Sequence, residues 1–130
     1  MSADYPGGTH WALLVWHSKA GSFYYYDSLL DHNERAARKT AHAMSASLGA
    51  KIPINFVKVT VNQQNNNYDC GMHLLAIAHQ IGSNFTRDQY ADGYYFEPGK
   101  IDVKEFRDRL KKIIVNLAKS SNPVNISILI

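Results

Sequence analysis

The sequence changes character within one stretch, Gln64-Asn65-Asn66-Asn67-Tyr68-Asp69-Cys70-Gly71-Met72, which contains the only cysteine of the chain. Its first part is polar and favours turns, whereas an apolar run, residues 74–78, follows directly. This pattern predicts a helix that begins at or beside Cys70 and runs to about residue 81. The N–H groups at a helix N-terminus favour a thiolate over a thiol. Cys70 is therefore a candidate nucleophile, and the plainer alternative is a small buried hydrophobic residue.

A histidine and an aspartate upstream are placed to meet on a β-hairpin. Residues 10–17, aromatic and aliphatic, predict a strand buried on both faces, and residues 22–28 predict a second strand. So short a connection predicts antiparallel pairing. If the hairpin turns about residues 18 and 19, His10 lies opposite Asp27, and a turn shifted toward the following glycine moves the pairing by a residue or two. In either register the imidazole and the carboxylate come close together.

The rest of the chain predicts an α+β fold, with a small mixed or antiparallel sheet packed by helices. No repeat or domain boundary is visible, so we expect residues 1–130 to form a single domain. Asp31 or Asn33 can cap the first helix and Gly49 can end it, while Asp102 can cap the last one. The predicted segments are an amphipathic helix at 33–48, a strand at 54–61, a polar loop at 62–69, an irregular segment at 85–99, an amphipathic helix from 102 and a strand or docked end after 123.

Composition excludes several classes of function. With 45% hydrophobic and 19% charged residues the chain is ordinary globular protein, and its formal charge of +3 comes from scattered basic residues, which argues against nucleic acid. No run is long enough to cross a bilayer and the start lacks a signal-peptide pattern, so we expect no membrane partner and a cytoplasmic or nuclear location. One cysteine excludes an intramolecular disulfide. Cys70 and His73 share a predicted helix face, but His79 lies mostly off it, so no metal or other cofactor is expected.

A thiol protease needs a thiolate, an imidazole that exchanges its proton, a group that orients the imidazole and donors for the developing oxyanion. The chain offers Cys70, His10, Asp27 and Gln64 for these roles, in that order of function. Gln64 lies on the loop that delivers the cysteine, and its side-chain amide can join the Cys70 N–H as an oxyanion donor. A structural role for the strand histidine is the alternative.

These residues resemble the ubiquitin-like-modifier protease family, which includes the sentrin-specific proteases and, more distantly, adenain. The resemblance rests on a His-Trp pair at residues 10–11, Asp27 seventeen positions on, and Gln64 six residues before the cysteine of Asp-Cys-Gly-Met at 69–72. With 23–28 included, the deneddylase branch is the most similar. The resemblance implies a papain-like arrangement with the order His-Asp-Gln-Cys and no cofactor. It also implies hydrolysis after the C-terminal Gly-Gly of a ubiquitin-like modifier of the Nedd type.

By the same resemblance His10 is the general base, Asp27 orients it, Cys70 is the nucleophile and Gln64 is the oxyanion donor. Trp11 matches the indole that flattens the glycine tail of the substrate, and a core position on the first strand is its alternative.

Two departures from the family pattern leave alternatives open. The loop before Cys70 is longer than in the deneddylases, so an insertion can promote Gln63 in place of Gln64. Family domains also carry a substantial portion upstream of the catalytic histidine, which supplies much of the modifier-binding surface. We therefore expect a partial catalytic domain, and a SUMO-specific protease or a truncated, non-catalytic modifier-binding relative is the alternative function.

Overall fold

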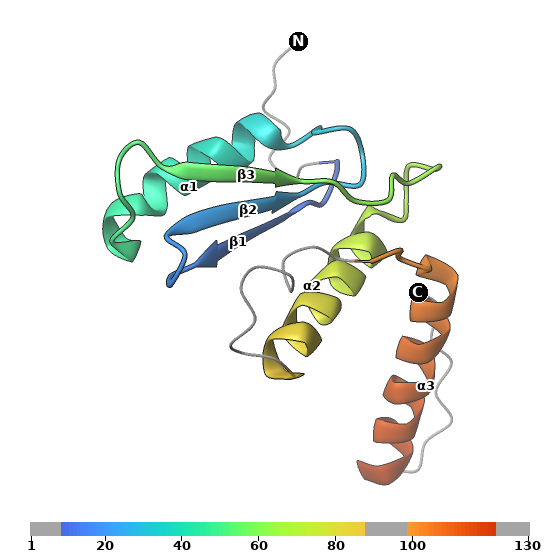
Figure 1. Ribbon diagram of the computed structural model, residues 1–130. Helices are drawn as coiled ribbons and strands as arrows, with labels where there is room; N and C mark the ends of the chain where they lie inside the picture. The colour runs from blue at the N-terminus through green and yellow to red at the C-terminus, as the bar shows by residue number, and fades with distance from the viewer. Residues whose placement is uncertain (1–8, 88–98, 122–130) are drawn as a thin grey trace.

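The computed structural model describes residues 9–87 and 99–121. Two strands, a helix and a third strand form the first part of this chain, and two helices follow (Figure 1). In chain order the elements are β1 (Leu13–His17), β2 (Ser22–Tyr26), α1 (Glu34–Leu48), β3 (Asn55–Val59), α2 (Cys70–Arg87) and α3 (Val103–Ser121). The predicted α+β class is confirmed. The predicted end strand after residue 123 and most of the irregular segment lie outside the described residues.

The three strands form a mixed sheet in the order β1-β2-β3. β1 and β2 pair antiparallel, with Leu13 opposite Tyr26 and Trp16 opposite Phe23, whereas β2 and β3 are parallel. The hairpin turn closes with the Gly21 N–H on the Ser18 carbonyl at 3.2 Å, and Gly21 has a φ of 63°. The turn therefore lies further toward Gly21 than one about residues 18 and 19. Its register is the shifted one of the two that the sequence allowed.

α1 and α2 cover opposite faces of the sheet, and α3 packs along α2 (Figure 1). Because side chains alternate along a strand, Phe23 and Tyr25 of β2 face α1, while Tyr24 and Tyr26 face α2. On the α2 side, Tyr26 packs with Ile77 and Ile81 into a buried cluster. Partly buried side chains surround that cluster: Leu13, Val15, Tyr24, Val59, Val61 and Ile101.

Local capping explains the end of α1 and the start of α3. Gly49 ends α1 with a left-handed φ of 70°, and Asp102 caps α3 by accepting the Glu105 N–H at 3.0 Å, both as predicted. α2 begins at Cys70, which is also confirmed. The predicted side-chain cap of α1 is wrong for Asn33, which makes no cap hydrogen bond. The Asn33 side-chain amide instead donates to the His10 carbonyl oxygen at 2.9 Å.

Two sequence-based boundaries need correction. The first strand begins at Leu13 rather than at residue 10, and its residues are half-buried rather than buried on both faces. β1 is an edge strand, so one flank lacks a neighbouring strand in the described part of the chain. α2 continues to Arg87, past the predicted end near residue 81. α3 packs along α2, where the His79 and Phe106 rings are 5.9 Å apart. Within the additional turns, which include Gly82, the Thr86 hydroxyl donates to the Ser83 carbonyl at 3.0 Å.

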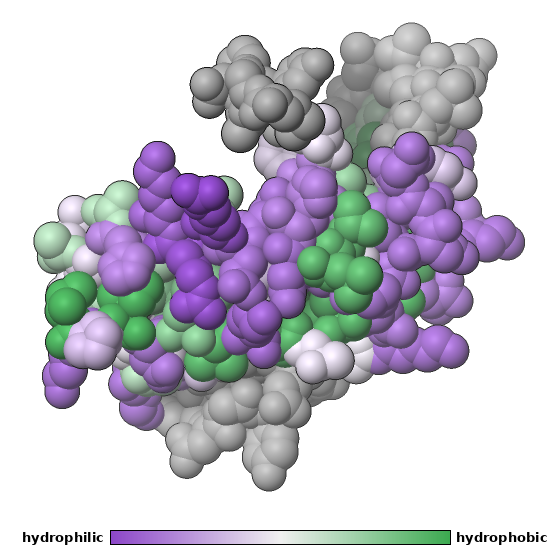
Figure 2. Space-filling view, turned by 90° about the horizontal axis from the view of Figure 1, so that it is seen from above, coloured by the Kyte–Doolittle hydropathy of each residue, from purple (hydrophilic) through white to green (hydrophobic). Residues whose placement is uncertain are grey.

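Apolar side chains also reach the surface. Figure 2 shows them in patches among hydrophilic side chains on the face seen there. No helix within residues 9–87 and 99–121 combines the length and apolar character needed to span a bilayer. The exposed large hydrophobic side chains in these ranges are Trp11, Leu30, Met44, Ile52, Tyr68, Leu75, Phe85, Ile113 and Leu117.

Candidate active site

The start of β1 and the ends of β2 and β3 lie at the same end of the sheet, because β1 is antiparallel and β3 parallel to β2. His10 precedes β1, Asp27 directly follows β2, and the loop after β3 leads to Cys70. Figure 1 shows α2 starting near this end of the sheet. The strand directions thus bring the predicted site residues to the same end of the fold.

His10 and Asp27 form a buried pair. The His10 Nε2 lies 2.5 Å from the Asp27 Oδ1, and the two side chains are 2% and 0% exposed. A carboxylate accepts, so Nε2 carries the proton in this bond and Nδ1 is the nitrogen left to accept a proton. The sequence predicted that these two residues meet. Both lie just beyond the paired residues of their strands, where the chain is not held to the sheet register.

The Asp27 carboxylate is held by several donors. Its Oδ1 also accepts the Leu29 N–H at 2.9 Å, and its Oδ2 accepts the Asn33 N–H at 2.9 Å and the Tyr25 hydroxyl. Burial by itself raises the pKa of the Asp27 carboxyl, but the hydrogen bonds from Tyr25, Asn33, His10 and Leu29 outweigh it and keep the pKa below its usual value. Asp27 is therefore ionised at neutral pH.

The loop that carries Cys70 is fastened to the turn after Asp27. Backbone and side chain of Gln64 both bond to Ser28: the Gln64 N–H donates to the Ser28 carbonyl at 2.8 Å, and the Ser28 hydroxyl donates to Gln64 Oε1 at 2.6 Å. Gln63 donates to the Asp27 carbonyl at 3.0 Å and accepts the Leu30 N–H at 2.6 Å. These bonds connect the cysteine loop to the aspartate that holds His10.

The two glutamines differ in the donors they have left. Gln63 Nε2 donates to two carbonyls, those of Asp27 at 3.0 Å and Val61 at 3.2 Å. An amide has two N–H bonds, so these contacts use both. Gln64 Nε2 donates to the Asn66 carbonyl at 2.6 Å, which leaves its second N–H. Of the two alternatives, Gln64 is the one whose amide has an N–H without a partner within residues 9–87 and 99–121.

Asn66 and Arg107, to which the sequence analysis gave no role, hold the loop just before the thiol. Asn66 Oδ1 accepts the N–H groups of Tyr68 and Asp69 at 3.1 and 2.9 Å, which is an Asx turn. Asp69 also forms an ion pair with Arg107 of α3. The hydrogen bond from Asn66 lowers the pKa of the Asp69 carboxyl, burial opposes this, and Arg107 lowers it further. The asparagine-rich sequence was a signal for the turn, but nothing local pointed to Arg107.

Cys70 itself is buried, with 7% of its surface exposed, and it is not part of a disulfide. The His73 N–H donates to the Asp69 carbonyl at 2.9 Å, so Cys70 occupies the first turn of α2. The N–H groups of a first turn have no partner within their own helix, and they are available to an anion. Within residues 9–87 and 99–121, no hydrogen bond joins Cys70 Sγ to His10. Hydrogen bonds between catalytic groups are often long without substrate and shorten when substrate binds.

Three large hydrophobic side chains near the site in sequence are exposed. Trp11 adjoins His10, Leu30 follows the Asp27 turn and Tyr68 precedes Cys70. They are 67%, 84% and 73% exposed. The alternative that Trp11 is a core residue is therefore wrong, and its role at a substrate tail stays a prediction.

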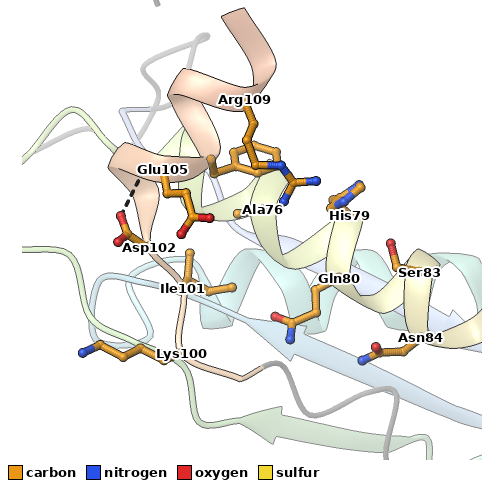
Figure 3. A pocket seen from close by; sticks show the side chains of 11 residues that line it. Ala76, His79, Gln80, Ser83, Asn84, Lys100, Ile101, Asp102, Glu105 and Arg109 are labelled. Carbon is orange, nitrogen blue, oxygen red and sulfur yellow. Dashed lines mark hydrogen bonds between the residues drawn. The ribbon is translucent and has the colours of Figure 1, made fainter. Parts of the chain in front are cut away.

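No group of three metal-ligating side chains occurs in the described ranges. His79 instead lines a cavity of about 320 Å³ between α2 and α3, shown in Figure 3. Arg109 and Glu105 of α3 border the same cavity, together with Gln80 and Asn84 of α2. Cys70 and His73 do not line it. His79 therefore faces a different part of the molecule from Cys70 and His73.

An α+β fold that places a buried His–Asp pair at the end of the sheet near which a helix begins with cysteine is the arrangement that a cysteine peptidase domain requires. The chain matches the C-terminal catalytic domain of the Ulp1 protease family over residues 5–121. It belongs to that family.

Three relatives with protease names are similar to this chain. Human sentrin-specific protease 8 is 36% identical over 115 residues, which are 87% of this chain and 53% of that protein. NEDD8-specific protease 1 of Arabidopsis thaliana is 31% identical over 87% of this chain and 51% of its own length. NEDD8-specific protease 1 of Schizosaccharomyces pombe is 36% identical over 88% of this chain and 27% of its own length. The chain thus spans about half the length of the human and plant relatives, and less of the yeast one.

Proposed function

We propose that this chain is the catalytic part of a cysteine peptidase that hydrolyses the bond after the C-terminal Gly-Gly of a ubiquitin-like modifier of the NEDD8 type. The observation that carries the proposal is the buried His10–Asp27 pair at 2.5 Å, tied by hydrogen bonds to the loop that delivers Cys70. Family membership supports the reaction class. The names of the plant and yeast relatives support the NEDD8 type.

The proposed reaction begins with proton transfer from the Cys70 thiol to His10 Nδ1, while Nε2 stays bonded to Asp27. The thiolate attacks the glycine carbonyl carbon, and the resulting oxyanion takes hydrogen bonds from the Cys70 N–H and the remaining Gln64 Nε2–H. The imidazolium of His10 then returns its proton to the leaving amine, and a thioester remains on Cys70. Water, deprotonated by His10, hydrolyses the thioester and restores the thiol.

The substrate reaches this site along exposed apolar side chains. We assign Trp11 to the glycine tail, because a flat indole beside His10 favours residues that lack side chains. Leu30 and Tyr68 offer apolar surface on the Asp27 and Cys70 sides. A nucleophilic thiol has to stay reduced, so we place the reaction in the cytoplasm or nucleus, where the modifier and its conjugates are the partners.

The test uses modifiers with a C-terminal electrophile, in parallel for NEDD8, SUMO and ubiquitin. We expect the chain to form a covalent adduct with the NEDD8 probe near neutral pH and Cys70→Ala to form none. Release of a fluorophore from the matching conjugate then shows turnover. Labelling with SUMO alone would overturn the specificity, and binding of modifier without adduct would identify a non-catalytic relative.

A further inference from the structure

Tyr25 is a buried tyrosine whose hydroxyl contacts the Asp27 carboxylate. Its side chain lies on the central strand, the residue is 1% exposed, and its ring centroid is 5.7 Å from that of Phe56. The hydroxyl donates to Asp27 Oδ2 and accepts the Asn33 N–H at 3.1 Å. A phenylalanine would fill the same apolar space, so the contribution particular to tyrosine is this pair of hydrogen bonds.

The Tyr25 hydroxyl completes a set of donors on both carboxylate oxygens. Oδ1 accepts from His10 Nε2 at 2.5 Å and from the Leu29 N–H at 2.9 Å, while Oδ2 accepts from Tyr25 and from the Asn33 N–H at 2.9 Å. A carboxylate with donors on both oxygens loses bonds on both when it rotates. Holding Oδ2 therefore places Oδ1 in front of His10.

Asn33 links the same hydrogen bonds to the histidine backbone. Its N–H bonds both Tyr25 and Asp27, and its side-chain amide donates to the His10 carbonyl at 2.9 Å. The position of the His10 backbone and the orientation of the Asp27 carboxylate thus depend on one connected network, in which the Tyr25 hydroxyl is a side-chain donor from the buried strand.

We propose that Tyr25 is a positioning residue: its hydroxyl holds the Asp27 carboxylate in the orientation from which Oδ1 accepts the His10 Nε2–H. This role rests on the proposed peptidase function only for its effect on turnover. The arrangement of the three side chains can be tested without activity.

Several titratable groups surround this network, and each bears on its pH dependence. Burial is the largest cause that raises the pKa of the Tyr25 hydroxyl, and Asp27 and Asp31 raise it further. The hydrogen bond from the Asn33 N–H lowers it. The His32 ring lies 5.3 Å from that of His10, edge to face. Loss of the Tyr25 hydroxyl removes a donor that lowers the Asp27 pKa, so that pKa rises in the variant.

The first experiment compares Tyr25→Phe with the unmodified chain in hydrolysis of the NEDD8–fluorophore conjugate. We expect kcat to fall about tenfold, the effect of losing one hydrogen bond to a charged group, with KM unchanged. The acid limb of the kcat profile moves to higher pH. Tyr24→Phe, on the opposite face of the same strand, is the matched control and leaves both unchanged. An unaltered pH profile in Tyr25→Phe overturns the proposal.

The second experiment uses the unmodified chain, so it requires neither activity nor a stable variant. NMR follows Asp27 by its carboxyl carbon, Tyr25 by its ring Cζ and His10 by its ring nitrogens during acid titration. We expect the Tyr25 and His10 signals to shift together with protonation of Asp27, while exposed Tyr68 shows no such step. A Tyr25 signal that does not respond to Asp27 overturns the proposal. If no modifier is cleaved, the peptidase function fails, and this titration still decides the role of Tyr25.

Discussion

At the residue scale, the two neighbouring glutamines have the same chemistry but different surroundings. The Gln63 amide hydrogens bond to the carbonyls of Asp27 and Val61, and its oxygen accepts the Leu30 N–H. Gln64 keeps its oxygen on Ser28 and one hydrogen on Asn66. The first therefore supports the loop, and the second has a donor to offer the oxyanion.

This difference predicts that substitution of Gln64 affects mainly kcat and substitution of Gln63 mainly stability. Gln64→Ala should lower kcat about 10²–10³-fold, because the oxyanion loses a donor. Gln63→Ala should change kcat only a few-fold and lower the free energy of unfolding by about 1 kcal/mol, because it removes loop hydrogen bonds. Conjugate hydrolysis and urea denaturation measure the two quantities. Gln64→Glu, which keeps an oxygen for Ser28, is the matched control and should be as inactive as Gln64→Ala. A large kcat loss in Gln63→Ala alone would transfer the role to Gln63.

At the scale of elements, α2 contains a buried histidine one turn after Cys70. His73 is 6% exposed, and its Nδ1 has no hydrogen-bond partner within the described residues. Burial lowers the pKa of His73, and the nearby Asp69 carboxylate opposes this. The folded state therefore binds a proton at His73 less readily than the unfolded state does.

His73 therefore makes the free energy of unfolding fall as the pH drops from about 7 to about 5. The sign follows because the unfolded imidazole, with a pKa of about 6.5, takes up its proton first. His73→Leu should flatten this dependence and raise stability at pH 5 by about 1 kcal/mol, because an unsatisfied buried polar group is removed. Urea denaturation at a series of pH values measures it. His17 has a pKa lowered in the same direction, so a residual slope remains. A slope identical to that of the unmodified chain would contradict the assignment to His73.

Elements with local signals were predicted well from the sequence. Asp102 and Gly49 mark helix ends through bonds within a few residues, and the polar-to-apolar change at Cys70 marks the start of α2. Apart from His10, the donors to Asp27 were not predicted, because whether the Tyr25 hydroxyl meets Asp27 depends on how the chain turns after β2. The Asp69–Arg107 pair joins residues 38 positions apart in sequence, and only the packing of α3 brings them together.

At the scale of the whole molecule, the sheet order and the distribution of the core required the structure. The antiparallel hairpin follows from its short turn, but the parallel pairing of β2 with β3 is non-local and spans α1. The apolar period of α3 predicted a helix, yet it did not reveal that Ile113 and Leu117 are 51% and 64% exposed. Buried apolar contact is concentrated where α2 meets the sheet.

That distribution predicts which apolar side chains stabilise the fold. Ile77 of α2 is 1% exposed and packs with Tyr26 and Ile81, so Ile77→Ala should lower the free energy of unfolding by about 2–5 kcal/mol. Ile113→Ala in α3, at 51% exposed, should cost less than about 1 kcal/mol, because little of its surface is withdrawn from water. Urea denaturation followed by circular dichroism measures both. Equal losses would mean that α3 contributes as much to the core as the contact between α2 and the sheet.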